Sequence, residues 1–477
     1  MTVLSRASLS RLPATIVRPG HEAGGISTGI VHFGPGAFHR AHQAHYVDRV
    51  LDQDPRWGIA AVSLRSGSTT DALKRQDGLY TLAVIDREPS MRVVAAHSEA
   101  IGPGEGARLR ALLANPAVRI ATSTVTEKGY CLGSDGTLDF AHPDIVHDLN
   151  APAEPASVIG WIVAGLRDRR AAGVAPFAML CCDNMTGNGG KLRAACAALA
   201  REQDPELAEW IEAEVAFPDS MVDSITPASD AAFLGKVQAA LGVDDAAAVQ
   251  RESFTQWVLQ RFDLTDGPDL AAAGVTLTGD VRGYEQAKLR ILNGAHSSLA
   301  YIGLALGHET VFEAVSDPAL GAFVGRLMHQ DIAASLKPVE GLDVAGYADA
   351  VLARFRNPEI RHLLSQIAWD GSQKLPYRLL DTVAEALAAG RSVERLAVPV
   401  AAWMAFVRRK ALAGETITDP LAGALAGAAG GETPVAALLG MRQVFSARVA
   451  EDARFREAVA GAFAGFERGA VAGLLAR

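Results

Sequence analysis

The sequence predicts an α/β protein in two parts, the first a doubly wound parallel sheet and the second mostly α-helical. Over roughly the first 200 residues, short apolar runs of strand type alternate with helical runs, and strands separated by helices imply parallel pairing. From about residue 285 the chain changes to long Ala/Leu-rich segments with helical spacing. We therefore expect a first domain over residues 1–280 and a second over residues 281–477.

The elements of the first domain follow from these runs. Strands are expected at residues 29–34, 57–65, 118–126 and 176–184. Helices are expected at residues 38–52, 69–77 and 157–173. In the second domain, the segments "LLDTVAEALAAG", "VPVAAWMAFVRRKAL" and "DARFREAVAGAFAGFERGAVAGLLAR" predict helices, and the Ala/Gly-rich run 421–434 predicts a helix followed by a glycine turn.

Composition excludes several classes of protein. Hydrophobic residues make up 49% of the chain and charged residues 21%, which is typical of folded globular proteins. The net charge is -9 and the basic residues are scattered, so no nucleic-acid partner is expected. No apolar run suits a signal peptide or a membrane span, so we expect a cytoplasmic protein without a membrane partner.

The four cysteines fit a reducing compartment. Cys181 and Cys182 are adjacent in a predicted strand and should point to opposite faces of the sheet. Cys131 and Cys196 lie far from them in sequence, beside mostly apolar residues. A disulfide framework is therefore not expected.

A glycine-containing turn, "GPGAFHR", follows the first strand. Gly34 and Gly36 stand where a dinucleotide-binding fold places its tight turn and its close approach to pyrophosphate, and His39 replaces the third glycine of the usual fingerprint. From this motif alone, a turn without ligand is about as probable as a phosphate-binding loop. We assign Phe38, His39 and Arg40 to the cofactor side of the turn, where His39 and Arg40 could have either a structural or a phosphate-side role.

The second and third strands supply further cofactor candidates. The second strand lacks the acidic residue that holds a ribose 2′-hydroxyl, and "LRSGS" follows instead. Arg65 could pair with the 2′-phosphate of NADP or be a solvated loop residue, so both NAD and NADP remain open. Thr126, in the turn that ends the strand at 118–126, is also assigned to the cofactor site.

A metal site is not expected. His39, His42 and His45 form H-x2-H-x2-H, but residues six apart do not share a helical stripe, and no acidic or cysteine ligand accompanies them. The sequence also contains neither a G-x-S-x-G nucleophile motif nor a P-loop.

Four polar residues interrupt an otherwise apolar helical run. Glu285, Lys288, Asn293 and His296 fall within an arc of about 140° on a regular helix. A desolvated lysine can accept the proton of an alcohol, an asparagine can donate to the oxygen as charge develops, and a histidine can orient a hydroxyl. Metal-free alcohol oxidation is one interpretation, and a core helix with locally satisfied polar groups is the other.

Three more residues are candidates for substrate contacts. Asn184 ends a strand, where it could cap a helix or face a ligand. Lys374 and Arg378 are four residues apart, so on a helix they would share a face and could bind a carboxylate, although Arg378 could equally be a surface residue.

The chain resembles the mannitol dehydrogenase family of long-chain polyol dehydrogenases over nearly its whole length. The matching blocks include "IVHFGPGAFHRAHQAHYVD", "TVTEKGYC", "CCDNMTGNGG", "FPDSMVDSITP", "KLRILNGAHSSLAYIG" and "DGSQKLPYRLL". The resemblance implies a Rossmann-type N-terminal domain, a helical C-terminal domain and metal-independent hydride transfer between a secondary alcohol and nicotinamide. Two departures are the absence of an acidic residue after the second strand and Ser224, where many relatives have arginine.

The resemblance also implies residue roles. Lys288 is the general base, Asn293 and Asn184 bind the reacting oxygen, His296 contacts a substrate hydroxyl, and Glu285 resembles a proton-channel glutamate. Asp223 and Lys374 match substrate-binding positions.

We expect a monomeric enzyme that interconverts a polyol and its ketose, with D-mannitol and D-fructose first. The alternative is a fructuronate reductase acting on D-mannonate and D-fructuronate. A catalytically silent nicotinamide-binding sensor is the alternative from a different class.

Overall fold

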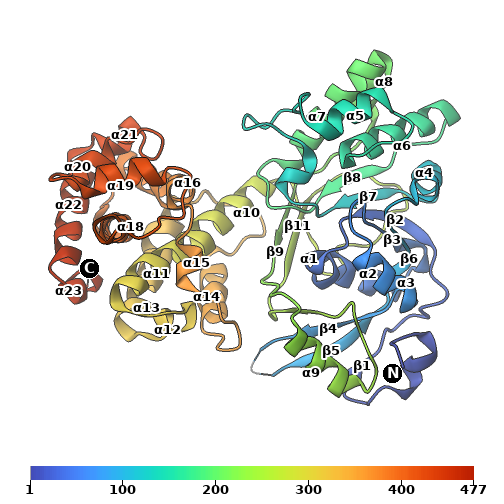
Figure 1. Cartoon of the computed structure of the whole chain (residues 1–477), viewed down its shortest axis with the longest axis horizontal. Helices are drawn as coiled ribbons and strands as arrows, with labels where there is room; N and C mark the ends of the chain where they lie inside the picture. Colours follow the sequence, from blue (N-terminus) through green and yellow to red (C-terminus); the bar gives the residue numbers. More distant parts are fainter. Residues whose placement is uncertain (1, 87, 477) are drawn as a thin grey trace. The chain divides into compact units, whose positions relative to one another are not determined.

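The computed structural model describes residues 2–86 and 88–476. The chain divides into two compact units, Met1–Arg282 and Gly283–Arg477 (Figure 1). Each is described separately.

A five-stranded parallel sheet is the centre of the first unit. Its order is β6-β3-β2-β7-β8, and every neighbouring pair is parallel. The strands are β2 (Thr28–Phe33), β3 (Gly58–Val62), β6 (His97–Ile101), β7 (Ile120–Ser123) and β8 (Ala178–Cys181). The chain runs outward from β2 through β3 to β6 and then returns to β7, which confirms the doubly wound prediction. Ligands in such sheets bind at the carboxyl ends of the strands, near this reversal between β2 and β7.

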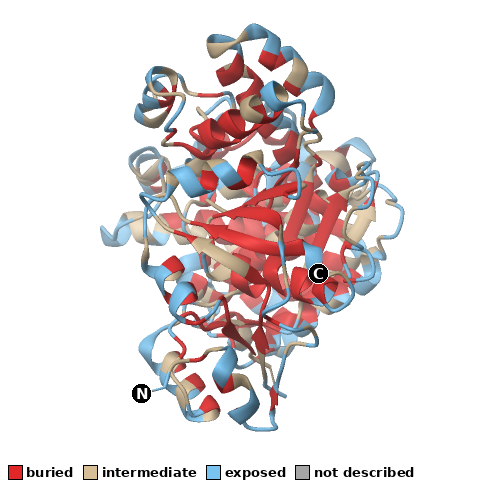
Figure 2. Ribbon diagram, turned by 90° about the vertical axis from the view of Figure 1, so that its right-hand side faces the viewer, coloured by how far each residue is buried: buried red, intermediate tan, exposed pale blue. Residues whose placement is uncertain are grey.

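Helices cover both faces of this sheet. Ile30 packs with residues of α1 (Ala37–Ala41), α2 (Gln43–Leu51) and α3 (Ser68–Arg75), whereas Val31 packs with α4 (Gly106–Ala114), α6 (Val158–Ala172) and α7 (Asn188–Gln203). The strands are therefore buried on both sides, as Figure 2 shows, which explains their nearly continuous apolar sequences.

Cys181 and Cys182 belong to the two opposite hydrophobic clusters, as predicted from their adjacency in a strand. All four cysteines are buried free thiols.

Two smaller sheets and several further elements complete the first unit, and the sequence patterns did not predict them. A mixed sheet has the order β1-β5-β4-β10, and a three-stranded sheet has the order β12-β11-β9. Their strands are β1 (Ile16–Val17), β4 (Tyr80–Val84), β5 (Ser90–Val94), β9 (Ser220–Asp223), β10 (Val249–Arg251), β11 (Gln256–Gln260) and β12 (Thr276–Thr278). The remaining helices are η1 (Arg6–Arg11), η2 (Pro55–Trp57), η3 (Glu127–Tyr130), α5 (Pro143–Asn150), α8 (Pro205–Glu214) and α9 (Ala231–Leu241).

The helix expected at residues 38–52 is two helices. His42 separates α1 from α2 with φ -121° and ψ -88°, outside the helical region. Its ring Nε2 lies 2.8 Å from the carbonyl oxygen of Gln256 in β11, so a contact from a distant strand accompanies the break.

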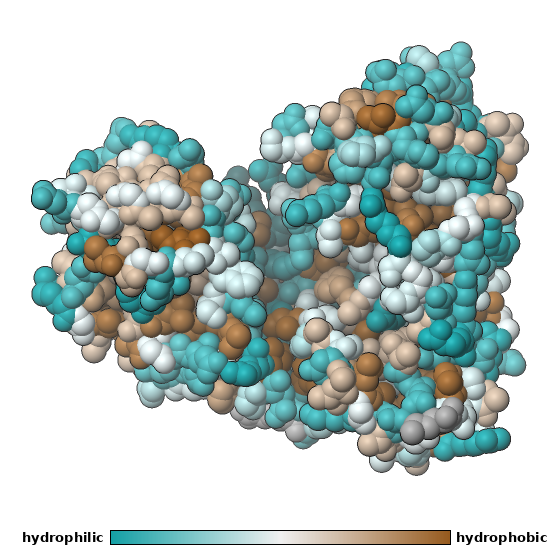
Figure 3. Space-filling model, in the orientation of Figure 1, coloured by the Kyte–Doolittle hydropathy of each residue, from teal (hydrophilic) through white to brown (hydrophobic). Residues whose placement is uncertain are grey.

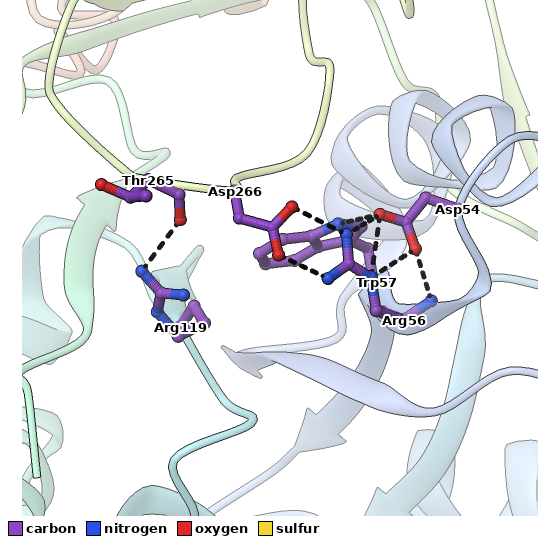
Figure 4. Close-up of polar contacts among 6 residues, drawn as sticks. All are labelled: Asp54, Arg56, Trp57, Arg119, Thr265 and Asp266. Carbon is purple, nitrogen blue, oxygen red and sulfur yellow. Dashed lines mark hydrogen bonds and ion pairs between the residues drawn. The ribbon is translucent and has the colours of Figure 1, made fainter.

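Polar contacts hold a loop against the amino ends of the sheet strands (Figure 4). Arg56, just before β3, bonds Asp54 on one side and Asp266 of the loop on the other, at 2.7 Å and 2.6 Å. Arg119, just before β7, donates to the carbonyl oxygen of Thr265 at 3.2 Å. Because these groups lie at the ends opposite the carboxyl edge, they support the fold and leave that edge to the ligand.

The second unit is helical, as predicted. Its core packs α18 against α11 and α22, with Trp403, Phe445 and Phe455 fully buried. Its α-helices are α10 (Val281–Ala287, which begins at the end of the first unit), α11 (Asn293–Leu306), α12 (Val311–Ser316), α13 (Pro318–Arg326), α14 (Val344–Phe355), α15 (Leu364–Ile367), α16 (Gly371–Leu375), α17 (Asp381–Ala388), α18 (Glu394–Ala413), α19 (Ala422–Gly430), α20 (Pro434–Leu439), α21 (Ala447–Ala450), α22 (Ala453–Glu467) and α23 (Val471–Leu475).

Three π-helical segments and one 3-10 turn interrupt this pattern. The π segments are η4 (Lys288–Leu292), η5 (Leu327–Ile332) and η7 (Pro376–Leu380), and the 3-10 turn is η6 (Ala333–Ser335). π turns are rare and occur frequently at functional sites. Two of the three contain or border predicted site residues.

The surface is mixed in character. On the face drawn in Figure 3, polar and apolar residues are interspersed. Within the described part of the chain, every helix is too short or too polar to cross a bilayer.

Candidate active site

The turn after β2 has the geometry of a dinucleotide-binding loop. Gly34 has φ +88°, and a Cβ there would lie 2.2 Å from the carbonyl oxygen of Thr124, so only glycine fits. Gly36 is exposed, and a Cβ there would meet nothing nearer than the Gly34 oxygen at 4.0 Å. One glycine is thus required by the backbone, and the other leaves open space at the carboxyl end of β2, which fits the approach of a pyrophosphate.

Three buried histidines lie beneath this loop. The rings of His32 and His39 stack with their centroids 3.4 Å apart, and His39 Nε2 lies 3.1 Å from His97 Nε2. Burial lowers the pKa of His32 and of His97 to about 3 and that of His39 well below its usual value, so all three rings are neutral. The complete burial of His39 does not support the predicted cofactor contact, because the ring is shielded from any ligand. It supports the loop from inside the core.

Arg40 and Phe38 also brace the loop. The Arg40 guanidinium donates to the Pro35 carbonyl at 2.5 Å and to the Ala247 carbonyl at 3.1 Å, and the residue is only 7% exposed. Phe38 is partly buried and stacks on His42 with centroids 5.0 Å apart. Arg40 therefore fixes the glycine turn through its backbone, which is the structural one of the two roles, structural or phosphate-side, that the sequence left open for it.

The three histidines of the H-x2-H-x2-H pattern have different surroundings. His39 faces His97, His42 bonds the Gln256 carbonyl, and His45 is buried near several arginines. Burial and the charge of Arg251 lower the pKa of His45 to about 2. Each ring thus has a role in packing or hydrogen bonding within the fold.

A cavity of about 720 Å³ lies at the carboxyl ends of β3 and β6. Val62, Ile101 and Trp161 provide apolar walls, and Arg65 and Asp144 provide the polar part. The Arg65 side chain is 77% exposed and forms an ion pair with Asp144 at the start of α5. No acidic residue follows the second strand directly. The cavity nevertheless contains one, Asp144, which comes from a distant part of the chain.

The loop after β7 carries backbone strain. Thr126 has φ +66° and ψ +159°, a region that is essentially restricted to glycine. Its N–H and that of Val125 donate to the Asp183 carboxylate at 3.1 Å and 2.8 Å, and the Tyr130 hydroxyl donates to the same group at 2.5 Å. Burial raises the pKa of Asp183. The carboxylate holds the strained, exposed Thr126 at the carboxyl edge of the sheet, which agrees with its predicted location.

Asn184 is exposed three residues after the end of β8 and does not cap a helix, because α7 begins at Asn188 with Gly187 as its N-cap. Asn188 is the structural residue of this pair. Its fully buried side chain bonds the backbone of Ser220 through both amide atoms, at 2.8 Å and 2.9 Å. Asn184 is therefore the asparagine that is accessible at the carboxyl edge.

Asp223 is a buried carboxylate, 5% exposed, at the last position of β9. The following Ser224 donates to the Phe254 carbonyl at 3.0 Å, and the N–H of Ile225 donates to Glu252 at 2.6 Å. These two bonds anchor the "SITP" turn.

In the second unit, a π turn separates Lys288 from Asn293. The N–H of Asn293 donates to the carbonyl oxygen of Lys288, five residues earlier, and also to that of Leu289. On a regular α-helix residues five apart diverge by about 140°, whereas an i to i+5 bond places Asn293 one turn after Lys288. The regular-helix arc predicted from the sequence is therefore not the observed geometry, and the π turn aligns the two side chains more closely. Glu285 precedes Lys288 on α10 and is 8% exposed.

His296 lies one turn after Asn293, on α11. Its ring is 7% exposed, packs on Phe355 with centroids 4.4 Å apart, and meets His362 edge-on at 5.1 Å. Burial, with His362 and the charges of Arg354 and Arg378, lowers the pKa of His296 well below its usual value, so the imidazole is neutral. Its Nε2 is buried and has no hydrogen-bond partner among the described residues.

Lys374 and Arg378 lie on either side of the junction between α16 and η7. Lys374 Nζ donates to the Trp369 carbonyl at 2.6 Å and lies 4.0 Å from Asp370. Arg378 Nη1 donates to Ser297 Oγ at 3.1 Å, so Arg378 faces α11 and is half-buried. Burial, and next the charge of Arg378, lower the pKa of Lys374, which shows that the two cations influence each other.

Comparison with known families agrees with this geometry. The "Mannitol dehydrogenase Rossmann domain" family matches residues 28–270, and the "Mannitol dehydrogenase C-terminal domain" family matches residues 280–466. The chain belongs to the mannitol dehydrogenase family. It is thus a member of a family of polyol-type oxidoreductases.

Relatives within the mannitol dehydrogenase family cover nearly the whole chain. D-mannonate oxidoreductase of Escherichia coli (strain K12) is 40% identical over 97% of both chains. The crystal structure of a substrate-free D-sorbitol dehydrogenase matches with a TM-score of 0.93 and 32% identity, covering 99% of this chain and 100% of that one. The Pseudomonas fluorescens mannitol 2-dehydrogenase in a ternary complex with NAD and D-mannitol matches with a TM-score of 0.81 and 34% identity, covering 99% and 98%.

The sequence patterns missed several residues that position the site. His32, His97 and Asp183 hold the glycine loop and Thr126, and Asp144 balances Arg65. Of these residues, only Asp183 could have been recognised from its neighbours in sequence, because it precedes Asn184 at the end of a predicted strand. The others act through tertiary contacts that no short motif contains.

Proposed function

We propose that the protein is an NAD-dependent, metal-independent dehydrogenase that interconverts a secondary alcohol and a ketone on a six-carbon polyhydroxy substrate. The observation that carries this proposal is the π turn that aligns Lys288 with Asn293, one turn before the neutral His296. A base, an oxyanion donor and a hydroxyl-binding group in this order are what alcohol oxidation without a metal requires.

Gly34, Gly36 and Thr126 would hold the dinucleotide at the carboxyl edge of the sheet, and the cavity beside Arg65 would accept its adenosine end. When bound, the nicotinamide accepts or donates the hydride. NAD is favoured over NADP because a 2′-phosphate near Arg65 would have to compete with the carboxylate of Asp144.

In the proposed mechanism, Lys288 acts as a neutral amine and accepts the proton of the alcohol as the carbon gives up its hydride. The amide of Asn293 donates to the reacting oxygen, and the oxygen keeps this donor as the alcohol becomes a ketone. Asn184 is assigned as a second oxyanion donor by the family resemblance alone. His296 orients a neighbouring hydroxyl, and Asp223 and Lys374 are assigned to further substrate contacts. Glu285, one turn before Lys288, would relay the proton that Lys288 has accepted.

The family contains enzymes for neutral polyols and for sugar acids, so two substrate pairs are candidates. The sequence blocks place D-mannitol and D-fructose first. D-mannonate and D-fructuronate are the second pair, and the position of Arg378 favours them, as argued in the next subsection. A monomer that acts on a small molecule in the cytoplasm is part of the proposal.

The test is the absorbance of reduced nicotinamide with NADH or NADPH and either ketone. We expect NADH oxidation by the wild-type protein. Lys288→Ala should lower kcat about 10³-fold while NADH affinity stays unchanged, because only the base is removed. Lys410→Ala, which removes a lysine paired with Glu415 in the same unit, is the matched control and should keep full activity. Turnover by Lys288→Ala at the wild-type rate would refute the mechanism, and a protein that binds NADH but oxidises none of a broad substrate panel would be the silent sensor.

A further inference from the structure

We propose that Arg378 binds the carboxylate of the substrate, so that the enzyme acts on a sugar acid, an aldonate and its keto acid, in preference to a neutral polyol. This inference rests on the proposed function and names the substrate class of the same site.

The fold brings Arg378 directly against the catalytic helix. If Gly294 carried a Cβ, that atom would lie only 2.8 Å from the carbonyl oxygen of Arg378. The backbone of η7 therefore approaches α11 closely at a position where α11 has no side chain. The guanidinium then donates from Nη1 to Ser297, the residue after His296. The Arg378 charge is also one of the causes that lower the pKa of His296, which places the guanidinium near that ring.

The Arg378 guanidinium has no counter-charge within the described chain. It forms an ion pair with none of the described carboxylates, and its Nε is buried without a hydrogen-bond partner. Its polar surroundings are the hydroxyls of Ser297, Tyr301 and Tyr377. Arg378 is half-buried, and withdrawing a cation from water without a counter-charge costs free energy that an anionic ligand would offset.

Nearby acidic groups are already engaged elsewhere. Asp419 accepts from the N–H of Ser372 at 2.8 Å and from the hydroxyl of the same residue. Asp370 lies beside Lys374, whose amine is also held by the Trp369 carbonyl. Of the pair predicted to bind a carboxylate, Arg378 is therefore the cation without a counter-charge among the described residues, whereas Lys374 lies beside Asp370 and can still donate to a substrate oxygen.

The chemistry favours a carboxylate over a phosphate. The planar guanidinium offers parallel donors that match two carboxylate oxygens. A phosphate would bring roughly one more negative charge and three oxygens, and the charge of the nearby Lys374 is already partly offset by Asp370. The buried Nε2 of His296, also without a described partner, would then meet a substrate hydroxyl near the carboxylate.

The experiment compares kcat/KM for D-fructuronate and D-fructose in the wild-type protein and in Arg378→Gln. We expect the wild-type protein to prefer the acid. Arg378→Gln should lower kcat/KM for the acid about 10²- to 10³-fold, mainly through KM, and change that for D-fructose less than about threefold. Arg378→Lys should lose an intermediate amount, because it keeps the charge without the planar fork.

Arg395→Gln is the matched control. Arg395 is also a partly buried arginine of the second unit, but it pairs with Asp331. Its loss should lower thermal stability and leave the ratio of the two kcat/KM values unchanged. If Arg378→Gln does not fold, the wild-type ratio and Arg378→Lys still decide the question.

The outcomes separate this inference from the proposed function. A wild-type enzyme that reduces D-fructose well and D-fructuronate poorly, or prefers fructose 6-phosphate, would overturn the inference and retain the dehydrogenase. An unchanged substrate ratio in Arg378→Gln would also overturn it. Calorimetric binding of D-mannonate, with an affinity that Arg378→Gln abolishes, would support the carboxylate site even if no turnover occurred.

Discussion

Replacing each glycine of the β2 loop with alanine tests whether this loop binds the cofactor. At Gly36, φ is -65° and a new methyl group meets no atom of the protein within 4 Å except the Gly34 oxygen at 4.0 Å. Gly36→Ala should therefore fold normally and gain up to about 0.5 kcal/mol from the stiffer unfolded chain. The methyl group occupies the space proposed for the pyrophosphate, and crowding of that kind costs about 1–3 kcal/mol, or roughly 5- to 150-fold in NADH affinity.

Gly34→Ala should do the opposite. Alanine at φ +88° costs about 1–2 kcal/mol, and its Cβ would lie 2.2 Å from the Thr124 carbonyl, so the backbone must also move. We expect a loss on the order of 3 kcal/mol, seen as a lower apparent Tm of the first unit in scanning calorimetry.

The assays are thermal unfolding and fluorescence titration with NADH. Gly36→Ala should have the wild-type Tm and a lower affinity for NADH. Gly34→Ala should have a lower Tm than the wild-type protein, because its backbone must move. Wild-type NADH affinity in a well-folded Gly36→Ala protein would refute the assignment of this loop to the cofactor.

Two further predictions concern charge. Asp144→Asn should free Arg65 and raise kcat/KM for NADPH relative to NADH by about five- to tenfold, a modest effect because the ion pair is exposed; an unchanged ratio in steady-state kinetics would contradict this. His32 and His97 have pKa values of about 3 in the fold against 6.5 in the unfolded chain, so their contribution to stability is complete above pH 6.5 and is lost as the pH falls toward 3. The free energy of unfolding can be measured by urea denaturation between pH 6.5 and pH 3. In His97→Gln, this free energy should fall with decreasing pH less steeply than in the wild-type protein, by about 1.4 kcal/mol per pH unit. An unaltered slope would show that His97 is not the titrating group.

Most strands of the five-stranded parallel sheet could be predicted, because each is marked by a short apolar run in the sequence. The strands β2, β3, β7 and β8 are largely apolar runs between helical runs; β3, β7 and β8 lie within their predicted ranges, and β2 begins one residue earlier than predicted, at Thr28. The mixed sheet was not predicted: β4 and β5 are a local antiparallel pair that the sequence patterns missed, and β4 also pairs in parallel with β10, which lies more than 160 residues later in the chain. Such pairing leaves no periodic mark within either segment.

The candidate site divides in the same way. Gly34 and Gly36 follow a strand and could be recognised from the turn alone. For His39 the sequence left a structural and a phosphate-side role open, because its burial depends on the stacked His32 and on His97 from a distant strand. Asn184 and Asn188 look equivalent in sequence, and only the contacts with Ser220 show that Asn188 is structural.

The sequence by itself determined the alternation of elements, the family and the chemical types of the site residues, because these depend on short-range pattern and side-chain chemistry. Only the tertiary structure decided the geometry. A π turn replaces the regular helix between Lys288 and Asn293, and it depends on how the backbone carbonyls pair in the packed fold. The lack of a counter-charge at Arg378 likewise depends on which carboxylates the other segments of the second unit place near it. These segments are distant in sequence, so no local pattern predicts them.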